Sequence, residues 1–515
     1  MVEKYTLLKS KDDMTLEHNK NTLLYLKTGF SGTAGEAIED SEGNITLFVD
    51  PRYHIQADNE TKGKNIRVIK LDMKTSPLDA LKTILKSDDT LCIPSKSTKL
   101  STYEIYKKNL KGVKILPYDT EDEPAKNTKN EEVKPEISGM SYDKKIEKLK
   151  KRIKNQNIFI SSLEDVSYLL NLRSYNTPNT SVIKGKLLIL DNKTILFTDS
   201  KTPALKGIII EPFKKLKPVL FKIEDEILID KNTITLNDFN LIKNPKAIRK
   251  NPVALMSSIK TKNEIEHYKS AFKRLDNALY AFRAQIKPGL SEYRLKEIFE
   301  DELVKNGAKC TSFKTILAID DNSSSIHYSN YDKKKIIKEG DILLLDCGGY
   351  YEGGYATDIT RVFLCGKKPK NAKIKEIYTK VLKAQLNAFF KNFLETKPMD
   401  DIARKILKPA EKEGFLFPHS LGHGVGIPVH QAPPTLTVNP KYNCTLKNNM
   451  VFTIEPGLYK ESEFGIRLEN TVYFNKGKKI TLSKFPYEES LIDKNILTKQ
   501  EQNWLKTWQE GKMNE

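Results

Sequence analysis

The chain has 515 residues, of which 38% are hydrophobic and 30% charged, so it carries enough apolar material for two to four domain cores and is not a largely disordered protein. No apolar run approaches the roughly 18 residues of a membrane-spanning helix, and the first residues lack a signal-peptide stretch. Five scattered cysteines without CxxC spacing are typical of a reducing compartment. We therefore expect a folded cytoplasmic protein without a membrane partner.

The formal net charge of +19 suggests a comparison with nucleic-acid-binding proteins, whose basic surfaces displace counterions from phosphate. Only 11 of the 86 basic residues are arginines, the better side chain for gripping phosphates and bases, and the lysines are spread along the chain. No RNP, zinc-finger or helix-turn-helix signature accompanies the charge. The composition therefore favours a solvated lysine-rich surface, and we expect no nucleic-acid partner.

Two segments in the first half of the chain resemble each other. Residues 22–30 (TLLYLKTGF) precede a strand-like stretch at 45–52 (ITLFVDPR), and residues 166–174 (VSYLLNLRS) precede another at 194–201 (TILFTDSK). Each segment thus pairs an apolar run with a later strand that leads into an aspartate. Such alternation of short strands with helices predicts two copies of one α/β unit.

Two changes in residue composition and periodicity divide the chain into regions. Residues 121–139 (EDEPAKNTKNEEVKPEISG) are charged, contain two prolines and lack apolar periodicity, which predicts a linker. Helical periodicity becomes strong soon after residue 250. We therefore expect domains at residues 1–138, 139–252 and 253–515.

The last region predicts an α+β domain. Two helices are expected first, at 262–286 and 291–308, and three strands follow, at 311–320, 340–351 and 355–366. Helices followed by a run of strands predict a sheet that is covered by helices.

Four acids stand on apolar strands of this region, where a buried strand normally has none. They are Asp346, Asp358, Glu455 and Glu469. A carboxylate buried without a partner is either very costly or becomes protonated, so each acid requires a cation nearby. Lysine or arginine can serve one acid, but two divalent cations balance four, and ions about 3.5 to 4 Å apart can share a hydroxide.

The histidines support the same interpretation. Three of the seven in the chain, His419, His423 and His430, stand within residues 417–431 (FPHSLGHGVGIPVHQ). A carboxylate-rich site with a single imidazole suits manganese or a similar hard ion better than a cysteine-rich zinc site. The sequence therefore predicts a two-metal hydrolytic centre.

These motifs resemble those of the pita-bread metallopeptidases of family M24. The metal motifs of the family are matched, in order, by residues 343–361 (LLLDCGGYYEGGYATDITR), 419–430 (HSLGHGVGIPVH), 453–459 (TIEPGLY) and 465–470 (GIRLEN). The resemblance implies two divalent metal ions per subunit, with Mn preferred and Zn or Co as alternatives. It implies five metal ligands, namely Asp346, Asp358, His423, Glu455 and Glu469.

Nearly the whole chain takes part in the resemblance. Residues 28–38, 47–58 and 161–173 are similar to the two creatinase-type N-terminal domains of the cytosolic three-domain Xaa-Pro aminopeptidases, and 480–508 to their short C-terminal extension. The implied fold class is α/β and α+β multidomain, with two creatinase-like N-terminal α/β domains followed by a pita-bread catalytic domain. The implied activity is release of the N-terminal residue from peptides with proline in second position, by a homodimer.

The resemblance also implies roles for side chains around the metals. A hydroxide held between the ions would attack the scissile carbonyl with Glu455 as the base, while His327 and His430 hold or polarise that carbonyl. His327 is expected on the strand before the first aspartate. His419 and Arg467 would shape the proline pocket, with Arg467 on the strand face that carries Glu469.

Two further expectations concern a spacing and an arginine. Asp346 and Asp358 are twelve positions apart, one more than is usual in the family, and we expect the turn at Gly353 and Gly354 to absorb the extra residue. Arg52 matches a family arginine that contacts substrate from the N-terminal domain, which would make that domain a wall of the active site.

Two alternative functions remain open from the sequence. A prolidase would cut Xaa-Pro dipeptides, but prolidases carry an arginine soon after the third histidine, and residues 431–449 contain none. A pita-bread protein that only binds peptides or nucleic acid would have lost its ligands, whereas all five are retained here.

Overall fold

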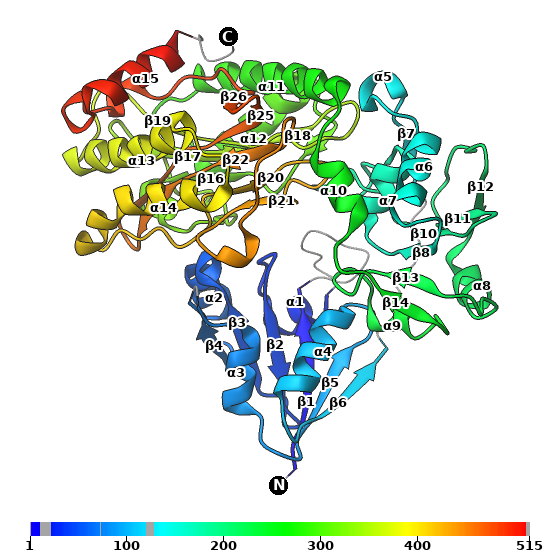
Figure 1. Ribbon diagram of the computed structural model, residues 1–515. Coiled ribbons are helices and arrows are strands. Elements are labelled where there is room, and N and C mark those ends of the chain that lie inside the picture. The colour runs from blue at the N-terminus through cyan, green and yellow to red at the C-terminus, as the bar shows by residue number, and fades with distance from the viewer. Residues whose placement is uncertain (1, 11–21, 73, 120–127, 511–515) are drawn as a thin grey trace. The chain divides into compact units, whose positions relative to one another are not determined.

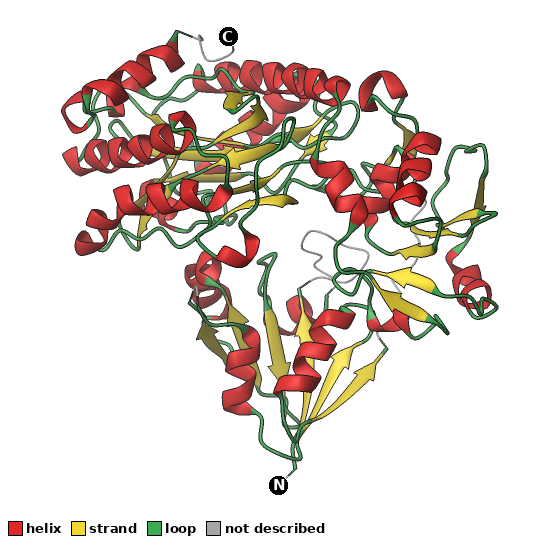
Figure 2. Cartoon of the chain, viewed as in Figure 1, coloured by secondary structure: helices red, strands yellow, loops and turns green. Residues whose placement is uncertain are grey.

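The computed structural model describes residues 2–10, 22–72, 74–119 and 128–510 (Figures 1 and 2). The chain folds into two compact units. The first contains Met1–Glu132, Ser141–Asn176 and Val182–Val253, and the second contains Val133–Met140, Thr177–Ser181 and Ala254–Glu515. Most of the predicted linker is described, but its residues 121–127 lie outside the described residues. No helix in the described part of the chain is long and apolar enough to cross a membrane.

The first sheet of the first unit has the strand order β4-β3-β2-β1-β5-β6. Strands β1, β2 and β3 are antiparallel neighbours, and β4, β5 and β6 join by parallel pairing. The strands are β1 (Lys4–Lys9), β2 (Glu36–Glu39), β3 (Ile45–Val49), β4 (Ile66–Lys70), β5 (Thr90–Pro94) and β6 (Lys114–Tyr118). The helices are α1 (Leu23–Thr28), α2 (His54–Thr61), α3 (Pro77–Ile84) and α4 (Leu100–Asn109).

The second sheet of this unit, β12-β11-β10-β8-β13-β14, repeats the same order of parallel and antiparallel neighbours. Its strands are β8 (Asn157–Ile160), β10 (Lys186–Ile189), β11 (Thr194–Phe197), β12 (Ile208–Glu211), β13 (Ile227–Ile229) and β14 (Pro245–Ala247). The helices are α6 (Tyr142–Arg152), α7 (Leu163–Leu170), α8 (Leu216–Leu220) and α9 (Leu236–Phe239). A short ladder pairs β7 (Glu131–Glu132) with β9 (Leu172–Arg173). The predicted repeat is therefore confirmed by topology.

The two apolar runs that reveal the repeat form helices α1 and α7. Each helix begins with a side-chain cap, in which Thr22 accepts from the Tyr25 amide and Ser162 from the Asp165 amide. Each ends at a left-handed residue, Gly29 in the first copy and Asn171 in the second. One apolar core contains residues of both sheets, which joins the copies into a single unit.

The second unit contains α5 (Pro135–Ser138) and most of α10 (Pro252–Ser258). The two predicted helices follow as α11 (Lys262–Arg283) and α12 (Glu292–Lys305), and α11 starts with a capping box between Thr261 and Glu264. The remaining helices are α13 (Ala372–Phe390), α14 (Thr396–Leu407) and α15 (Lys499–Gln509).

Two main sheets form the centre of the second unit. The three-stranded sheet has β17 (Ile342–Cys347) between β16 (Ile316–Ile319) and β19 (Ile359–Leu364). The five-stranded sheet has the order β21 (Gln431–Leu436), β20 (Gly422–Gly424), β22 (Val451–Ile454), β25 (Asn470–Asn475) and β26 (Lys478–Thr481). Two small ladders pair β15 (Cys310–Thr311) with β18 (Gly349–Tyr350), and β23 (Gly457–Lys460) with β24 (Phe464–Arg467).

Helices cover the three-stranded sheet from both faces, as Figure 1 shows for α13 and α11. Val362 and Leu364 of β19 belong to the core that contains α13 and α14. Phe363 points the other way and lies 5.8 Å, ring centre to ring centre, from Phe282 of α11. Residues of β19 therefore alternate between an even-numbered face toward α13 and an odd-numbered face toward α11.

Candidate metal centre

The five predicted metal ligands lie at strands of the two central sheets. Asp346 is within β17, Asp358 immediately precedes β19, and His423 is the middle residue of β20. Glu455 directly follows β22, and Glu469 lies between β24 and β25. Each of the four acids is next to a buried apolar residue, whereas His423 stands between two glycines. The apolar neighbours are Leu345, Ile359, Ile454 and Leu468.

His423 faces two of the acids. Its Nε2 lies 3.6 Å from Asp358 Oδ2 and 3.4 Å from Glu455 Oε1. One ligand atom each from Asp358, His423 and Glu469 lies within 4.8 Å of the other two. The other ring nitrogen, Nδ1, is 3.0 Å from the Gly424 carbonyl oxygen, to which it must donate. That bond leaves a lone pair on Nε2, the atom that faces the carboxylates.

Asp346 is held by an arginine on one side only. Arg467 donates to Asp346 Oδ2 from Nη2 at 2.6 Å and from Nε at 3.1 Å. Asp346 Oδ1 is buried and has no hydrogen-bond partner among the described residues. Thr360 links this pair to a further acid, because its hydroxyl accepts from Arg467 Nε at 3.2 Å and donates to Glu469 Oε2 at 2.8 Å.

The acids of this site are crowded and poorly compensated. Three of them are almost fully buried: Asp346 is 7% exposed, Asp358 4% and Glu469 1%. Burial raises the pKa of Asp346, and it raises the pKa values of Asp358 and Glu469 well above their usual range. For the latter two, repulsion from neighbouring carboxylates acts in the same direction as burial.

This donor set fits a pair of divalent cations. Arg467 brings one positive charge to a group of four carboxyl groups, and an oxygen of Asp346 is left without a hydrogen bond. Carboxylate oxygens with one imidazole are ligands that manganese and similar hard ions accept. Cations placed among these atoms would remove the repulsion that raises the pKa values.

His419 is tied to Arg467 through a tyrosine. Its Nδ1 donates to the Ser420 carbonyl oxygen at 2.9 Å, and its Nε2 lies 2.9 Å from the Tyr459 hydroxyl. Arg467 Nη1 donates to the same hydroxyl at 2.8 Å, so the proton of Tyr459 points toward His419. A buried chain of hydrogen bonds therefore runs from His419 through Tyr459 and Arg467 to Asp346.

The other two predicted histidines lie at the edge of this arrangement. His430 is exposed, and its ring centre is 4.4 Å from that of His423. His327 is half-buried and follows Ile326, whose carbonyl accepts from Arg467 Nη1 at 3.3 Å. The expectation that His327 lies on a strand is wrong. Strand β16 ends at Ile319, because the next residue has a φ of 47° and begins a 3-10 helix over Asp320–Ser324.

The two predicted arginines have separate environments. Arg52 belongs to the first unit, where it binds Asp50 through Nε at 3.0 Å and Nη2 at 2.7 Å. Arg467 is the last residue of β24, whereas Glu469 lies just beyond this strand. Both side chains nevertheless bind the hydroxyl of Thr360, which connects them. The predicted contacts of both arginines with substrate stay predictions.

The position at which we expect the extra residue between the two aspartates is a tight turn. Gly353 and Gly354 have φ values of 84° and 62°, in the left-handed region that favours glycine. The Gly354 amide donates to the Tyr351 carbonyl at 3.0 Å and closes this turn. Asp358 nevertheless reaches His423, as the distances above show.

Sequence reasoning missed two residues of this network, Thr360 and Tyr459. Both stand inside the motifs already singled out, two residues after Asp358 and four after Glu455. The period of two along a strand is the signal that could have found Thr360, because it places alternate residues on one face. No comparable signal exists for Tyr459, which depends on the pairing of β23 with β24.

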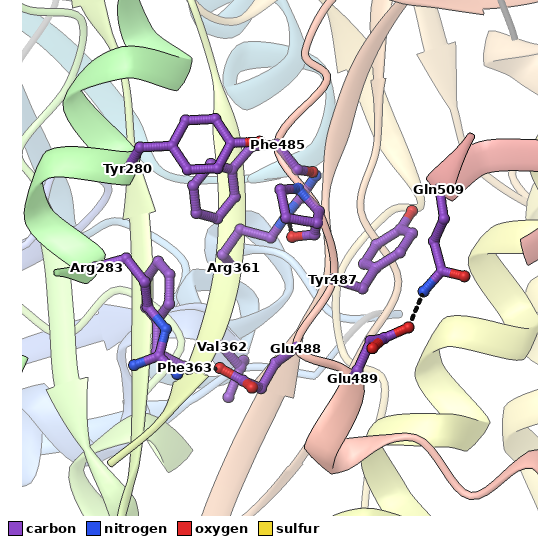
Figure 3. Close-up of a pocket in the computed structure, with 11 residues that line it drawn as sticks. Tyr280, Arg283, Arg361, Val362, Phe363, Phe485, Tyr487, Glu488, Glu489 and Gln509 are labelled. Carbon is purple, nitrogen blue, oxygen red and sulfur yellow. Dashed lines mark hydrogen bonds and ion pairs between the residues drawn. The ribbon is translucent and has the colours of Figure 1, made fainter. Parts of the chain in front are cut away.

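A cavity of about 480 Å³ lies beside β19, where Arg361, Val362 and Phe363 line it, and none of the predicted metal ligands does. Figure 3 shows its lining, in which Arg361 lies among Phe363, Phe485 and Tyr487. Arg361 has an odd number in β19, so it points away from the face of Thr360. This cavity is therefore separate from the candidate metal centre.

Comparisons with known proteins agree with the fold. The family described as Metallopeptidase family M24 matches residues 266–476, and the Creatinase/Prolidase N-terminal domain matches residues 7–123 and again 121–264. The X-prolyl aminopeptidase of Caenorhabditis elegans, a cytosolic enzyme with a di-nuclear active site, superposes with a TM-score of 0.88. The match covers 98% of this chain and 90% of that one at 22% identity, which shows a shared fold. The predicted fold class is confirmed.

Two sequence relatives differ in how much of the chain they match. Xaa-Pro aminopeptidase 1 of Dictyostelium discoideum is 28% identical, with 93% of this chain and 84% of the relative covered. The Xaa-Pro dipeptidase of Pyrococcus furiosus is 34% identical, with 62% of this chain and 94% of the relative covered. Together with the domain matches, these similarities show that the chain belongs to metallopeptidase family M24 and carries two creatinase/prolidase N-terminal domains.

Proposed function

We propose that this protein is a metal-dependent aminopeptidase that releases the first residue from peptides with proline in second position. The observation that carries the proposal is the group of Asp346, Asp358, His423, Glu455 and Glu469, in which three acids are buried and the other two side chains half-buried. The short separations around His423 and the raised pKa values of Asp346, Asp358 and Glu469 demand cations, and the family hydrolyses peptides. The likeness to a full-length Xaa-Pro aminopeptidase over 93% of this chain supports the substrate class.

The bond to be cut makes particular demands on the side chains. An Xaa-Pro bond is a tertiary amide, and its nitrogen must be protonated before it can leave. Bound divalent cations supply Lewis acidity and lower the pKa of water. Glu455 is half-buried beside His423 and can move a proton from the attacking water toward the leaving nitrogen. His430 and His327 are proposed to hold the scissile carbonyl and to stabilise the charge that develops on it.

The substrate's free amine is proposed to bind near Asp346, which would restrict cleavage to the N-terminus. Arg467 holds one oxygen of this carboxylate and leaves the other available, so the amine or a cation can approach Oδ1. His419 and Arg467 are proposed to shape the proline pocket, with Tyr459 fixing both. Arg52 is proposed to contact the peptide from the N-terminal domain.

The proposal includes Mn as the preferred ion, a cytoplasmic location and a homodimer. Mn is supported by the oxygen-rich donor set, although Zn or Co would also find suitable ligands here. The cytosolic C. elegans relative and the scattered cysteines support the location. The homodimer rests on the family resemblance alone.

A dipeptidase is the second candidate, because the P. furiosus Xaa-Pro dipeptidase is 34% identical. That relative matches 62% of this chain, whereas the D. discoideum aminopeptidase matches 93%. The longer match favours the aminopeptidase.

One assay distinguishes the aminopeptidase from the dipeptidase. Metal-free protein is reloaded with Mn, Co or Zn and given Arg-Pro-Pro, Arg-Ala-Pro and the dipeptide Arg-Pro. We expect release of arginine from Arg-Pro-Pro, with kcat/KM lower by more than about tenfold for the alanine peptide, because the pocket is built around the proline ring. Equal turnover of the two tripeptides would contradict the proline specificity. Cleavage of Arg-Pro alone would identify a dipeptidase.

A further inference from the structure

A lysine that the proposed mechanism does not use is buried near the histidine motif. Lys260 lies between α10 and α11 and is 3% exposed. Its Nζ donates to the Ser257 carbonyl oxygen at 2.7 Å and to Gln431 Oε1. Burial lowers the pKa of this amine to about 8, against the opposing effect of Glu264. Burying a cation is costly unless it is hydrogen-bonded, so these two bonds must hold the amine firmly.

Gln431 connects this lysine to the segment that carries the histidines. Its backbone pairs with Gly424 at the point where β20 meets β21, and this pair closes the loop of residues 425–430. Its side-chain amide folds into the loop, since a Cβ added to Gly426 would lie 2.2 Å from Gln431 Oε1. Gln431 Nε2 also donates to Ser257 Oγ at 3.0 Å. The amide therefore joins α10 and Lys260 to the inside of the loop.

Backbone carbonyls in the first half of this loop accept hydrogen bonds from neighbouring elements. The Val425 carbonyl accepts from the Tyr268 hydroxyl at 3.3 Å. The Ile427 carbonyl accepts from the Tyr350 hydroxyl at 2.8 Å. The Gly426 carbonyl accepts from the Ala356 amide at 2.8 Å. His430 follows these residues and immediately precedes Gln431, the residue whose side chain Lys260 holds.

We propose that Lys260 is a positioning residue that acts through Gln431 to hold His430 at its place beside His423. This inference rests on the proposed aminopeptidase function, in which His430 contacts the scissile carbonyl. A displacement of about 1 Å in a group that contacts the reacting atoms can cost on the order of a hundredfold in rate. His423 depends less on this anchor, because its amide donates to Thr453 Oγ1 at 3.1 Å and its ring to the Gly424 carbonyl.

The test replaces the ammonium group by a methyl thioether of similar length. Lys260→Met should lower kcat about tenfold on Arg-Pro-Pro, with KM and bound metal near the wild-type values. Gln431→Leu should act similarly, and the double variant should be no worse than either single one, because both remove the same link. Lys269→Met is the matched control, since Lys269 is a surface residue of α11 that pairs with Glu266. Gln431→Glu keeps an acceptor for Lys260 and should retain most of the activity.

Hydrogen exchange supplies a second readout that needs no substrate. In Lys260→Met, exchange should accelerate in a peptide covering residues 424–431, with the rest of α11 unchanged. Wild-type kcat in Lys260→Met, additive effects in the double variant, or loss of metal instead of rate would each overturn the inference. If the wild-type protein does not cleave Arg-Pro-Pro, the proposed function fails, and exchange then decides the positioning role alone. Faster exchange confined to residues 424–431 supports that role, and unchanged exchange overturns it.

Discussion

The two faces of β19 both bury charged side chains, but they treat them differently. On the even-numbered face, Thr360 contacts Glu469 beside Asp346 and Asp358, where acids crowd together. On the odd-numbered face, the Arg361 guanidinium donates to four backbone carbonyls, those of Thr360, Glu469, Phe485 and Pro486, at 2.7 to 3.1 Å. One face thus sets a single cation, Arg467, against several acids. The other gives every nitrogen of its cation an acceptor.

The even-numbered face therefore forms a site that requires a ligand, whereas the buried cation on the odd-numbered face stabilises the fold. A buried charge with a complete set of hydrogen bonds has no need of a further partner. Buried carboxyl groups that repel one another do, and a metal ion is the partner that family M24 uses. The same strand therefore provides a functional face and a structural face, and substitutions on the two faces should affect different properties.

The largest effect is expected on the functional face. Glu469→Ala removes a carboxylate that would hold the metal ions, so activity should fall by more than about a hundredfold and bound metal should decrease. Metal analysis beside kcat measurement checks the prediction, with Asp358→Ala as a second variant of the same kind. If either variant kept its full metal content and activity, the assignment of metal ligands after the extra residue before Asp358 would be wrong.

Histidines at the centre should separate metal binding from catalysis. His430→Ala is expected to keep its metal and to lose about a hundredfold in kcat, the usual scale for a group that stabilises the intermediate or transfers a proton. His423→Ala is expected to lose both metal and activity, because its Nε2 faces Asp358 and Glu455. Metal stoichiometry measured with kcat distinguishes them. The reverse outcome would exchange the roles of the two histidines.

The sequence predicted the candidate metal ligands, but not the hydrogen bonds that hold the side chains around them. Asp346, Asp358, Glu455 and Glu469 could be found because acids on apolar strands conflict with burial, which is visible in a one-dimensional pattern. The bond from Thr360 to Glu469 could not, since it depends on two segments more than a hundred residues apart. The bond from Lys260 to Gln431 could not be predicted either, because these two residues are 171 positions apart.

In the fold, too, features with a local sequence signal were predicted and features set by distant contacts were not. The repeat in the first unit was predicted from β3 and β11, because a run of apolar residues leading into aspartate is a local signal. The position of His327 was not predicted, because the end of β16 depends on the left-handed conformation of Asp320, whose side chain accepts from the Ile342 amide. Tertiary contacts, rather than propensity, fix such boundaries.

The structural face offers a matched test of a buried acid outside the metal centre. Asp276 of α11 accepts from Ser483 Oγ at 2.6 Å and from the Lys484 amide at 2.7 Å. Burial raises its pKa to about 6, although these bonds and the charge of Arg361 oppose the shift. The acid therefore resembles those of the centre in burial, but both of its oxygens accept hydrogen bonds, whereas Asp346 Oδ1 has no such bond among the described residues.

The smallest effect is expected from Asp276→Asn and should appear in stability alone. Below about pH 4 the carboxyl group is protonated in both the folded and the unfolded chain. As pH rises from about 4 to 6 the unfolded chain loses this proton first, so the folded state loses stability, by about 3 kcal/mol at most. Asparagine can keep both contacts, because the Ser483 hydroxyl can accept from its amide nitrogen. The difference in unfolding midpoint between variant and wild type should therefore grow from pH 4 to 6 in favour of the variant and then level off, with metal content and kcat unchanged. A midpoint difference that did not change with pH would mean that Asp276 remains ionised throughout, and a loss of metal would mean that the two faces of β19 are not independent.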